Sequence, residues 1–208
     1  DRCADISAII SACNERTKII FLANPNNPTG TFVDDVQLIK LANEIPEHTL
    51  LVLDGAYAEY IDKFDGGVEL VEKRNNVFMT RTFSKIHGLG SLRVGWCYGS
   101  EQVIETLNRV KAPFNISTVG QNAAVAAIKD IEYVYNCRNE NIQLREQLAF
   151  ELNKINIPCD RSFANFLLLR FRNQALAESA EQFLNKNGIL VRSVGNYGLE
   201  NALRISIG

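Results

Sequence analysis

Four short apolar runs without polar alternation constrain the fold of this 208-residue chain most strongly. They cover Ile19 to Ala23, Leu50 to Leu53, Val77 to Thr80 and Leu92 to Tyr98. Uninterrupted runs of this length are typical of strands covered on both faces, which occur mainly in parallel sheets. Segments with helical apolar spacing lie between or after them, at Asp34 to Ile45 and Glu101 to Lys111. Strands that alternate with helices predict an α/β unit with a mostly parallel sheet.

The second part of the chain shows a different pattern. From Val119 the spacing is helical, with a break near Asp130, and a long helix is predicted from about Glu132 to Lys154. After Pro158 the pattern predicts a strand, a helix ended by Gly188 and two further strands, at Phe166 to Phe171, Gln174 to Asn187, Ile189 to Val191 and Leu203 to Ile207. We therefore predict a large domain over residues 1–131, then an interdomain helix and a small α+β C-terminal domain over residues 132–208.

Composition narrows the class of protein. A hydrophobic fraction of 46% is enough to bury a substantial core, and a net charge of −2 provides no basic field for nucleic acid. No stretch approaches the roughly 18 apolar residues that a membrane span needs. The five cysteines include no C-x-x-C pair and only two histidines accompany them. We expect reduced, mostly buried cysteines in a cytoplasmic protein, no metal site, no nucleic-acid or membrane partner, and a small-molecule substrate.

Polar residues follow three of the predicted strands, at the edge where ligands bind in open α/β sheets. The first strand leads into the turn N-P-N-N-P-T-G (24–30), which presents the amide of Asn27. We expect at least one of its Asn–Pro bonds to be cis, more readily Asn27–Pro28. The second strand leads to Asp54 and Tyr57, and the third leads to Lys85. Each group alone is typical of a turn, a helix cap or a solvated lysine, but together they supply complementary parts of one site.

The residues around Lys85 suit a covalent cofactor site. A lysine amine can form a Schiff base with an aldehyde. Hydroxyl groups and a guanidinium can hold a phosphate, and the chain places them nearby at Thr82, Ser84 and Arg93. A group that carries both an aldehyde and a phosphate, such as pyridoxal phosphate, fits this set.

The motifs N-P-N-N-P-T-G, D-G-A-Y (54–57) and T-F-S-K-x-x-G-x-x-x-L-R-V-G (82–95) resemble those of fold-type I, class I/II pyridoxal-phosphate aminotransferases. Within that superfamily the chain is most similar to histidinol-phosphate aminotransferases, through G-I-L-V-R (188–192) and A-L-R-I-S-I-G (202–208). The resemblance covers nearly the whole chain. It implies a cytoplasmic homodimeric enzyme of histidine biosynthesis that moves an amino group between histidinol phosphate and 2-oxoglutarate or glutamate, with pyridoxal 5'-phosphate as cofactor.

The resemblance also implies roles for individual residues. Lys85 would form the Schiff base with the cofactor and move a proton at the substrate α-carbon. Asp54 would pair with the pyridine nitrogen and favour its protonated form. Tyr57 and Asn27 would hydrogen-bond the ring oxygen. The cofactor phosphate would bind at Thr82, Ser84 and Arg93.

Three residues are expected to bind substrate. Arg204 matches the arginine that grips the substrate carboxylate, Arg192 matches a position that meets the substrate phosphate, and Asn27 is expected to contact the substrate as well as the ring oxygen. The remaining arginines are predicted to lie on solvated faces: Arg109, Arg138, Arg145, Arg161, Arg170 and Arg172.

Aminotransferases of this type are much longer than this chain. The resemblance therefore implies that an N-terminal arm, a glycine-containing phosphate turn and an aromatic residue that stacks on the cofactor would precede Asp1. It also implies a short missing C-terminal stretch, so that both domains would be partial. Three other functions stay open: an aromatic or broad-specificity aminotransferase, a pyridoxal-phosphate decarboxylase of a phosphorylated amino acid, and a noncatalytic sensing domain that has kept the fold.

Overall fold

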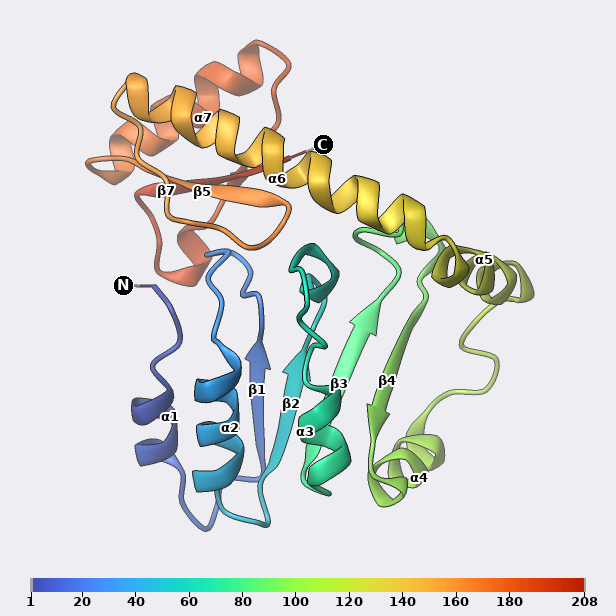
Figure 1. Ribbon diagram of the computed structural model, residues 1–208. Helices are drawn as coiled ribbons and strands as arrows, with labels where there is room; N and C mark the ends of the chain where they lie inside the picture. Colours follow the sequence, from blue (N-terminus) through green and yellow to red (C-terminus); the bar gives the residue numbers. More distant parts are fainter. Residues whose placement is uncertain (1, 208) are drawn as a thin grey trace.

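The computed structural model describes residues 2–207, so that Asp1 and Gly208, the ends of the two predicted domains, lie outside the described residues. The first sheet has the strand order β1-β2-β3-β4 (Figure 1). Its strands are β1 (Ile19–Ala23), β2 (Leu50–Asp54), β3 (Val77–Thr82) and β4 (Gly95–Gly99). The first three are parallel and β4 runs antiparallel to β3, which confirms the expected mostly parallel sheet.

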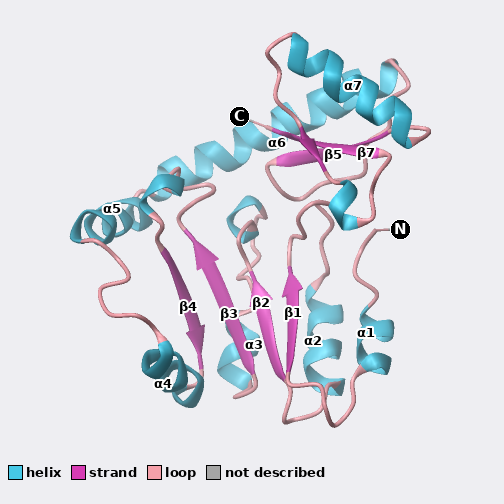
Figure 2. Cartoon of the chain, turned by 180° about the vertical axis from the view of Figure 1, so that it is seen from behind, coloured by secondary structure: helices cyan, strands magenta, loops and turns pink. Residues whose placement is uncertain are grey.

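Three helices cover one face of this sheet: α1 (Ile6–Ala12), α2 (Asp35–Glu44) and α3 (Val68–Lys73) (Figures 1 and 2). Of these, only α2 is predicted from the sequence. Its N-cap is Asp34, whose side chain accepts a hydrogen bond from the backbone N–H of Gln37 at 2.9 Å. Leu38 and Leu41 from α2 are buried against strand residues such as Leu51, and burying one such side chain contributes about 1.5–3 kcal/mol.

The other face of the sheet is covered unevenly. The central strands β2 and β3 are buried on both sides over most of their length, as the apolar runs predict. The prediction is wrong for β1 and β4, because little of residues 2–207 packs on their second face. Ile19 and Phe21 are 50% and 75% exposed, and four of the five residues of β4 are exposed.

The chain reverses between β3 and β4 through a turn that the apolar run from Leu92 to Tyr98 does not predict. Gly90–Leu92 forms the short 3-10 helix η2, and Arg93 adopts a left-handed conformation with φ of 54°. The predicted strand from Leu92 to Tyr98 therefore starts too early. The true strand begins at Gly95, and α4 (Glu101–Val110) follows as expected.

Two helices lead to the second sheet. They are α5 (Thr118–Lys129) and α6 (Ile131–Lys154), and Asp130 separates them by accepting a hydrogen bond from the backbone N–H of Tyr133 at 3.1 Å. The 24 residues of α6 run from α5 to the second sheet, as the sequence predicts for a bridging helix (Figure 1). The predicted domain boundary between residues 131 and 132 stays a prediction.

The second sheet is antiparallel, with the order β5-β7-β6. It contains β5 (Phe166–Arg170), β6 (Arg192–Ser193) and β7 (Ala202–Ser206), with α7 (Gln174–Lys186) between the first two. The predicted strand from Ile189 to Val191 is wrong. Gly188 has φ of 78°, and the N–H of Ile189 donates to the carbonyl of Leu184 at 2.9 Å, so that these residues still close the helix.

Within residues 2–207, none of the helices has the length and apolar character that crossing a membrane requires. The same residues contain no group of three or more His, Cys, Asp or Glu side chains placed to hold a metal ion. The prediction that the cysteines are mostly buried is wrong. Cys97 is exposed, and the others are partly exposed: Cys3, Cys13, Cys137 and Cys159.

Candidate active site

The parallel strands bring the predicted site residues to one edge of the first sheet. In the register of the strands, Ala23 of β1 lies opposite Asp54 of β2, which lies opposite Thr80 of β3. The turn with Asn27 follows β1, Asp54 ends β2, and Lys85 follows β3 by three residues. The carboxyl ends of the three strands therefore present these side chains together.

The turn after β1 is held at both ends. Both Asn24–Pro25 and Asn27–Pro28 are cis, which confirms the expectation of at least one cis bond. At the start, the buried side chain of Asn24 exchanges two hydrogen bonds of 2.8 Å with the backbone of Val33. At the end, the carbonyl of Gly30 accepts from the N–H of Phe163 at 2.8 Å. Asn27 is thus presented from a fixed backbone.

Arg204 reaches this turn from the second sheet. Its Nη1 donates to Oδ1 of Asn27 at 2.7 Å, and its guanidinium lies 5.1 Å from the ring centroid of Phe166. Because Oδ1 of Asn27 accepts this bond, the Nδ2 group of the same amide is left to act as a donor. Nε of Arg204 is buried without a hydrogen-bond partner among the described residues. This hydrogen bond joins the guanidinium of Arg204, in the second sheet, to the turn that follows β1 of the first sheet.

Arg192 lies directly opposite Arg204 on the neighbouring strands β6 and β7. Residues at such opposite positions point to the same face of a sheet, and like charges placed there destabilise it. Two arginines so placed are compatible with a site that binds an anion, which would relieve the repulsion between them.

The side chains of Asp54, Tyr57 and Lys85 differ in their surroundings. Asp54 is exposed, and its Oδ1 accepts from the N–H of Ala56 at 3.1 Å. Tyr57 is only 5% exposed and packs edge-on against Phe166, with ring centroids 5.3 Å apart. Nζ of Lys85 lies 5.3 Å from the Tyr57 ring centroid, within the range of a cation–π contact. The structure therefore brings the lysine amine and the tyrosine ring together.

The residues predicted to hold a phosphate form a second group beside Lys85. Oγ1 of Thr82 accepts from the N–H of Ser84 at 3.0 Å. Nη1 of Arg93 donates to the carbonyl of Gly90 at 2.6 Å and to Oγ of Ser84 at 3.4 Å. The left-handed conformation of Arg93 allows this return of the side chain toward residues earlier in the chain. A guanidinium and two hydroxyl groups are thus gathered at one exposed place, with the donors that a phosphate accepts from.

The family profile described as aminotransferase class I and II matches residues 1–208. The chain belongs to this aminotransferase family.

Similar proteins agree with this assignment. The chain is 50% identical to the histidinol-phosphate aminotransferase of Ruegeria sp. (strain TM1040) and 52% identical to that of Dinoroseobacter shibae, over 208 residues in each case. Each match covers 100% of this chain and 58% of the relative, so that the chain spans about three fifths of the length of these relatives.

The structure is also similar to the crystal structure of histidinol-phosphate aminotransferase from Sinorhizobium meliloti in complex with pyridoxal-5'-phosphate. The TM-score is 0.91 at 27% identity, covering 98% of this chain and 56% of the other. The expected fold-type I aminotransferase fold is thereby confirmed.

Arg81 of this aminotransferase chain holds the segment that carries Tyr57, a role that the sequence does not predict. It lies in β3 with a buried side chain, and donates to Glu59 at 3.1 Å and to the carbonyl of Asp65 at 2.6 Å. Gly66 has φ of +72°, and a Cβ added there would lie 1.9 Å from Nη2 of Arg81, so that a larger residue would push the guanidinium away from these partners. A buried guanidinium needs such partners, and by finding them it fixes the segment that carries Tyr57. The available signal is a lone arginine directly after an apolar run.

Three arginines predicted to lie on solvated faces have partners within the fold. Arg138 donates to the carbonyl of Glu59 at 2.7 Å, and Arg145 donates to the carbonyl of Ala164 at 3.0 Å. Burial lowers the pKa of Arg145. Arg170 lies 3.2 Å from Asp160. The prediction fails because these side chains find partners outside their own helix or strand.

Proposed function

We propose that the full-length protein is a pyridoxal-phosphate-dependent aminotransferase that moves an amino group between histidinol phosphate and 2-oxoglutarate or glutamate, in histidine biosynthesis. The observation that carries the proposal is the contact of Arg204 with Asn27 at 2.7 Å. It brings an anion-binding side chain of the second sheet to the edge of the first sheet where Lys85 lies. The 50% identity to a histidinol-phosphate aminotransferase supports this choice of substrate.

The residues at the carboxyl ends of β1, β2 and β3 offer a partner for each polar group of pyridoxal phosphate. When bound, the cofactor supplies an electron sink for the electrons of a broken bond at the substrate α-carbon. The Lys85 amine would hold the cofactor through its aldehyde carbon, and the Asp54 carboxylate would pair with the ring nitrogen. Tyr57 and the Nδ2 group of Asn27 would donate to the ring oxygen. The phosphate would be held by Thr82, Ser84 and Arg93.

Lys85 would act a second time, as a base. Once it is no longer bonded to the cofactor, its Nζ would be free to take the proton of the substrate α-carbon and deliver it to the former aldehyde carbon, two bonds away. The side chain is suited to this because it is exposed at the site while the Tyr57 ring beneath it is 5% exposed and fixed by packing. One amine can thus hold the cofactor and transfer the proton.

Arg192 and Arg204 would serve both substrates. Histidinol phosphate carries a phosphate and no carboxylate, whereas glutamate and 2-oxoglutarate carry two carboxylates. A guanidinium can pair with either group through two parallel donors. We assign the substrate carboxylate to Arg204, with Asn27 beside it, and the distal anion of either substrate to Arg192.

A donor screen on the full-length enzyme tests the proposal. Loaded with pyridoxal phosphate, it is expected to be yellow, to lose that colour with histidinol phosphate, and to react more slowly with phenylalanine and tyrosine. Equal rates with the aromatic donors would favour a broad-specificity aminotransferase. Carbon dioxide release from phosphothreonine would favour the decarboxylase. A colour that no donor changes would favour a sensing domain and contradict the proposal.

We also propose that the enzyme acts in the cytoplasm as a homodimer. Apolar side chains at the end of α4 and just beyond it support an interface, since Val110 is 76% exposed and Phe114 is 99% exposed. Light scattering on the full-length enzyme should give twice the mass of one chain. Cell fractionation should recover the activity with the soluble proteins.

A further inference from the structure

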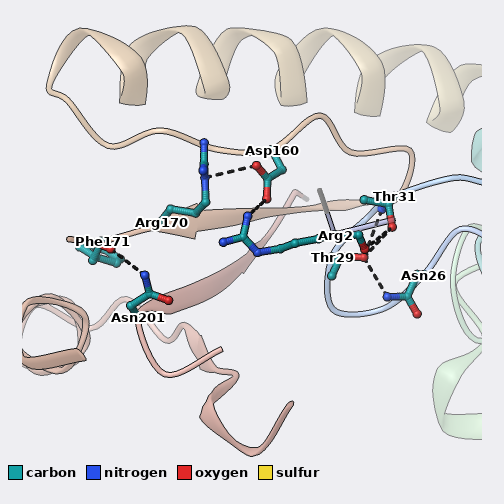
Figure 3. A network of polar contacts seen from close by, with 8 residues as sticks. All are labelled: Arg2, Asn26, Thr29, Thr31, Asp160, Arg170, Phe171 and Asn201. Carbon is teal, nitrogen blue, oxygen red and sulfur yellow. Dashed lines mark hydrogen bonds and ion pairs between the residues drawn. The ribbon is translucent and has the colours of Figure 1, made fainter. Parts of the chain in front are cut away.

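A line of polar contacts runs from the second sheet to the turn after β1, and in it Asp160 links Arg170 to Arg2 (Figure 3). Asp160 lies in the segment between α6 and β5. Its Oδ2 accepts from Nη1 of Arg2 at 2.7 Å, and its Oδ1 lies 3.2 Å from Nε of Arg170. The Asp160 and Arg2 side chains are only 22% and 28% exposed, so that solvent screens their interaction less than it screens a surface pair.

The line continues from Arg2 into the turn. Oγ1 of Thr31 donates to the carbonyl of Arg2 at 3.3 Å, and the hydroxyls of Thr31 and Thr29 lie 2.8 Å apart. Because a hydroxyl has one hydrogen, and that of Thr31 is used on Arg2, Thr29 donates to Thr31. Thr29 in turn accepts from Nδ2 of Asn26 at 2.8 Å. The contacts thus end on the residue next to Asn27.

The contacts form a closed ring. Arg170, at the end of β5, pairs with Ala202 of β7, and the same strand carries Arg204, which donates to Asn27. The turn is therefore fixed to the second sheet at two places, by Asp160 through Arg2 at Thr31 and by Arg204 at Asn27 itself. A change at one place is expected to alter the geometry at the other.

We propose that Asp160 is a positioning residue that acts through Arg2 to hold Asn27 and Arg204 in register for binding an anionic substrate; this rests on the proposed function. Removing the carboxylate leaves the Arg2 and Arg170 guanidinium groups facing each other without the anion between them. Their repulsion moves the turn away from β5 and weakens the contact of Arg204 with Asn27. The residues assigned to hold the cofactor ring on β2 and β3, Asp54, Tyr57 and Lys85, take no part in the ring of contacts.

Asp160→Asn in the full-length enzyme loaded with pyridoxal phosphate tests this proposal. The KM values for histidinol phosphate and 2-oxoglutarate should rise by about three- to tenfold, as expected for one partly buried charge pair. The kcat should change less than twofold, and the visible spectrum of the cofactor should stay the same. Asp160→Glu should recover most of the affinity. Arg172→Ala is the matched control, because it removes an exposed arginine near the same segment and should leave both constants unchanged.

A double-mutant cycle separates positioning from a general loss of stability. In an Arg2→Ala background, Asp160→Asn should raise KM by less than it does alone, because the two residues act through one contact. Full additivity of the two effects, an unchanged KM, or a kcat that falls in parallel with the cofactor content would overturn the proposal.

Succinate binding to the loaded enzyme, measured by calorimetry, keeps this inference separate from the proposed function. If no donor is transaminated, the proposed function fails. Succinate affinity weakened at least threefold by Asp160→Asn, and unaffected by Arg172→Ala, would still support the positioning role. Succinate affinity that Asp160→Asn leaves unchanged would refute it.

Discussion

Gly30→Ala tests how closely the turn and the second sheet fit together. Gly30 has φ of +73°, and a Cβ added there would lie 2.3 Å from Oγ and 2.7 Å from Cβ of Ser162. A left-handed conformation costs an ordinary residue about 1–2 kcal/mol. Overpacking adds about 1–3 kcal/mol. The free energy of unfolding should therefore fall by about 2–5 kcal/mol, the sum of these two ranges.

The displacement should also reach the site. Because the N–H of Phe163 donates to the carbonyl of Gly30, moving the turn away from Ser162 weakens this bond and separates Asn27 from Arg204. The KM for the anionic substrates should therefore rise together with the loss of stability.

Urea unfolding of the full-length enzyme measures the first effect, with Gly188→Ala as a matched control. Gly188 has φ of +78° but nothing within 4 Å of an added Cβ, so that only the backbone cost applies. The difference between the two variants isolates the steric part, about 1–3 kcal/mol. Adding Ser162→Gly to Gly30→Ala should restore some of it. If Gly30→Ala is no more destabilising than Gly188→Ala, the close contact with Ser162 is wrong.

Other residues give further tests. Asp54→Asn should slow the half-reaction by at least about a hundredfold while cofactor binding survives; near-normal rates in stopped-flow measurements would contradict the pairing with the ring nitrogen. Arg204→Ala should impair both half-reactions, because it removes the partner of the carboxylate of glutamate and 2-oxoglutarate and also the contact that positions Asn27 for either substrate. Arg192→Ala should impair only the half-reactions of substrates with a distal anion. Each loss should be about 1.5–3 kcal/mol in kcat/KM; unchanged histidinol-phosphate kinetics in Arg192→Ala would remove the histidine-pathway assignment. Burial lowers the pKa of His87, partly opposed by the charge of Glu59. Near this pKa the folded chain thus binds fewer protons than the unfolded chain, so the free energy of unfolding should fall as the pH drops through 6.5, the ordinary histidine pKa. His87→Gln should flatten this pH dependence, which urea titrations at about pH 5 and about pH 8 measure.

The strand ends can be predicted from the sequence because the information there is local. A continuous apolar run marks each of β1, β2 and β3, and parallel pairing then brings the residues that follow them to one edge. The positions of Asn27, Asp54 and Lys85 follow from this pairing without any distant contact. The same runs predict that both faces of a strand are covered but not which segment covers them, so that the exposed face of Phe21 could not be foreseen.

Long-range pairs account for most of what could not be predicted. Asp160 and Arg2 are 158 residues apart, and no spacing rule connects them. The partners of Arg81 lie in a loop whose path depends on Gly66 and on its left-handed conformation. The reversal at Arg93 was missed for a different reason, because a left-handed arginine is uncommon and the surrounding residues read as a strand.

The central claim is that Lys85 holds pyridoxal phosphate. Borohydride reduction of the loaded full-length enzyme, followed by peptide mapping with mass spectrometry, tests it most directly. The account predicts a pyridoxyl group on the peptide that contains Lys85, and its loss in Lys85→Arg, which keeps the charge but cannot form the bond. A pyridoxyl group found instead on Lys40, Lys63 or Lys111 would contradict the claim.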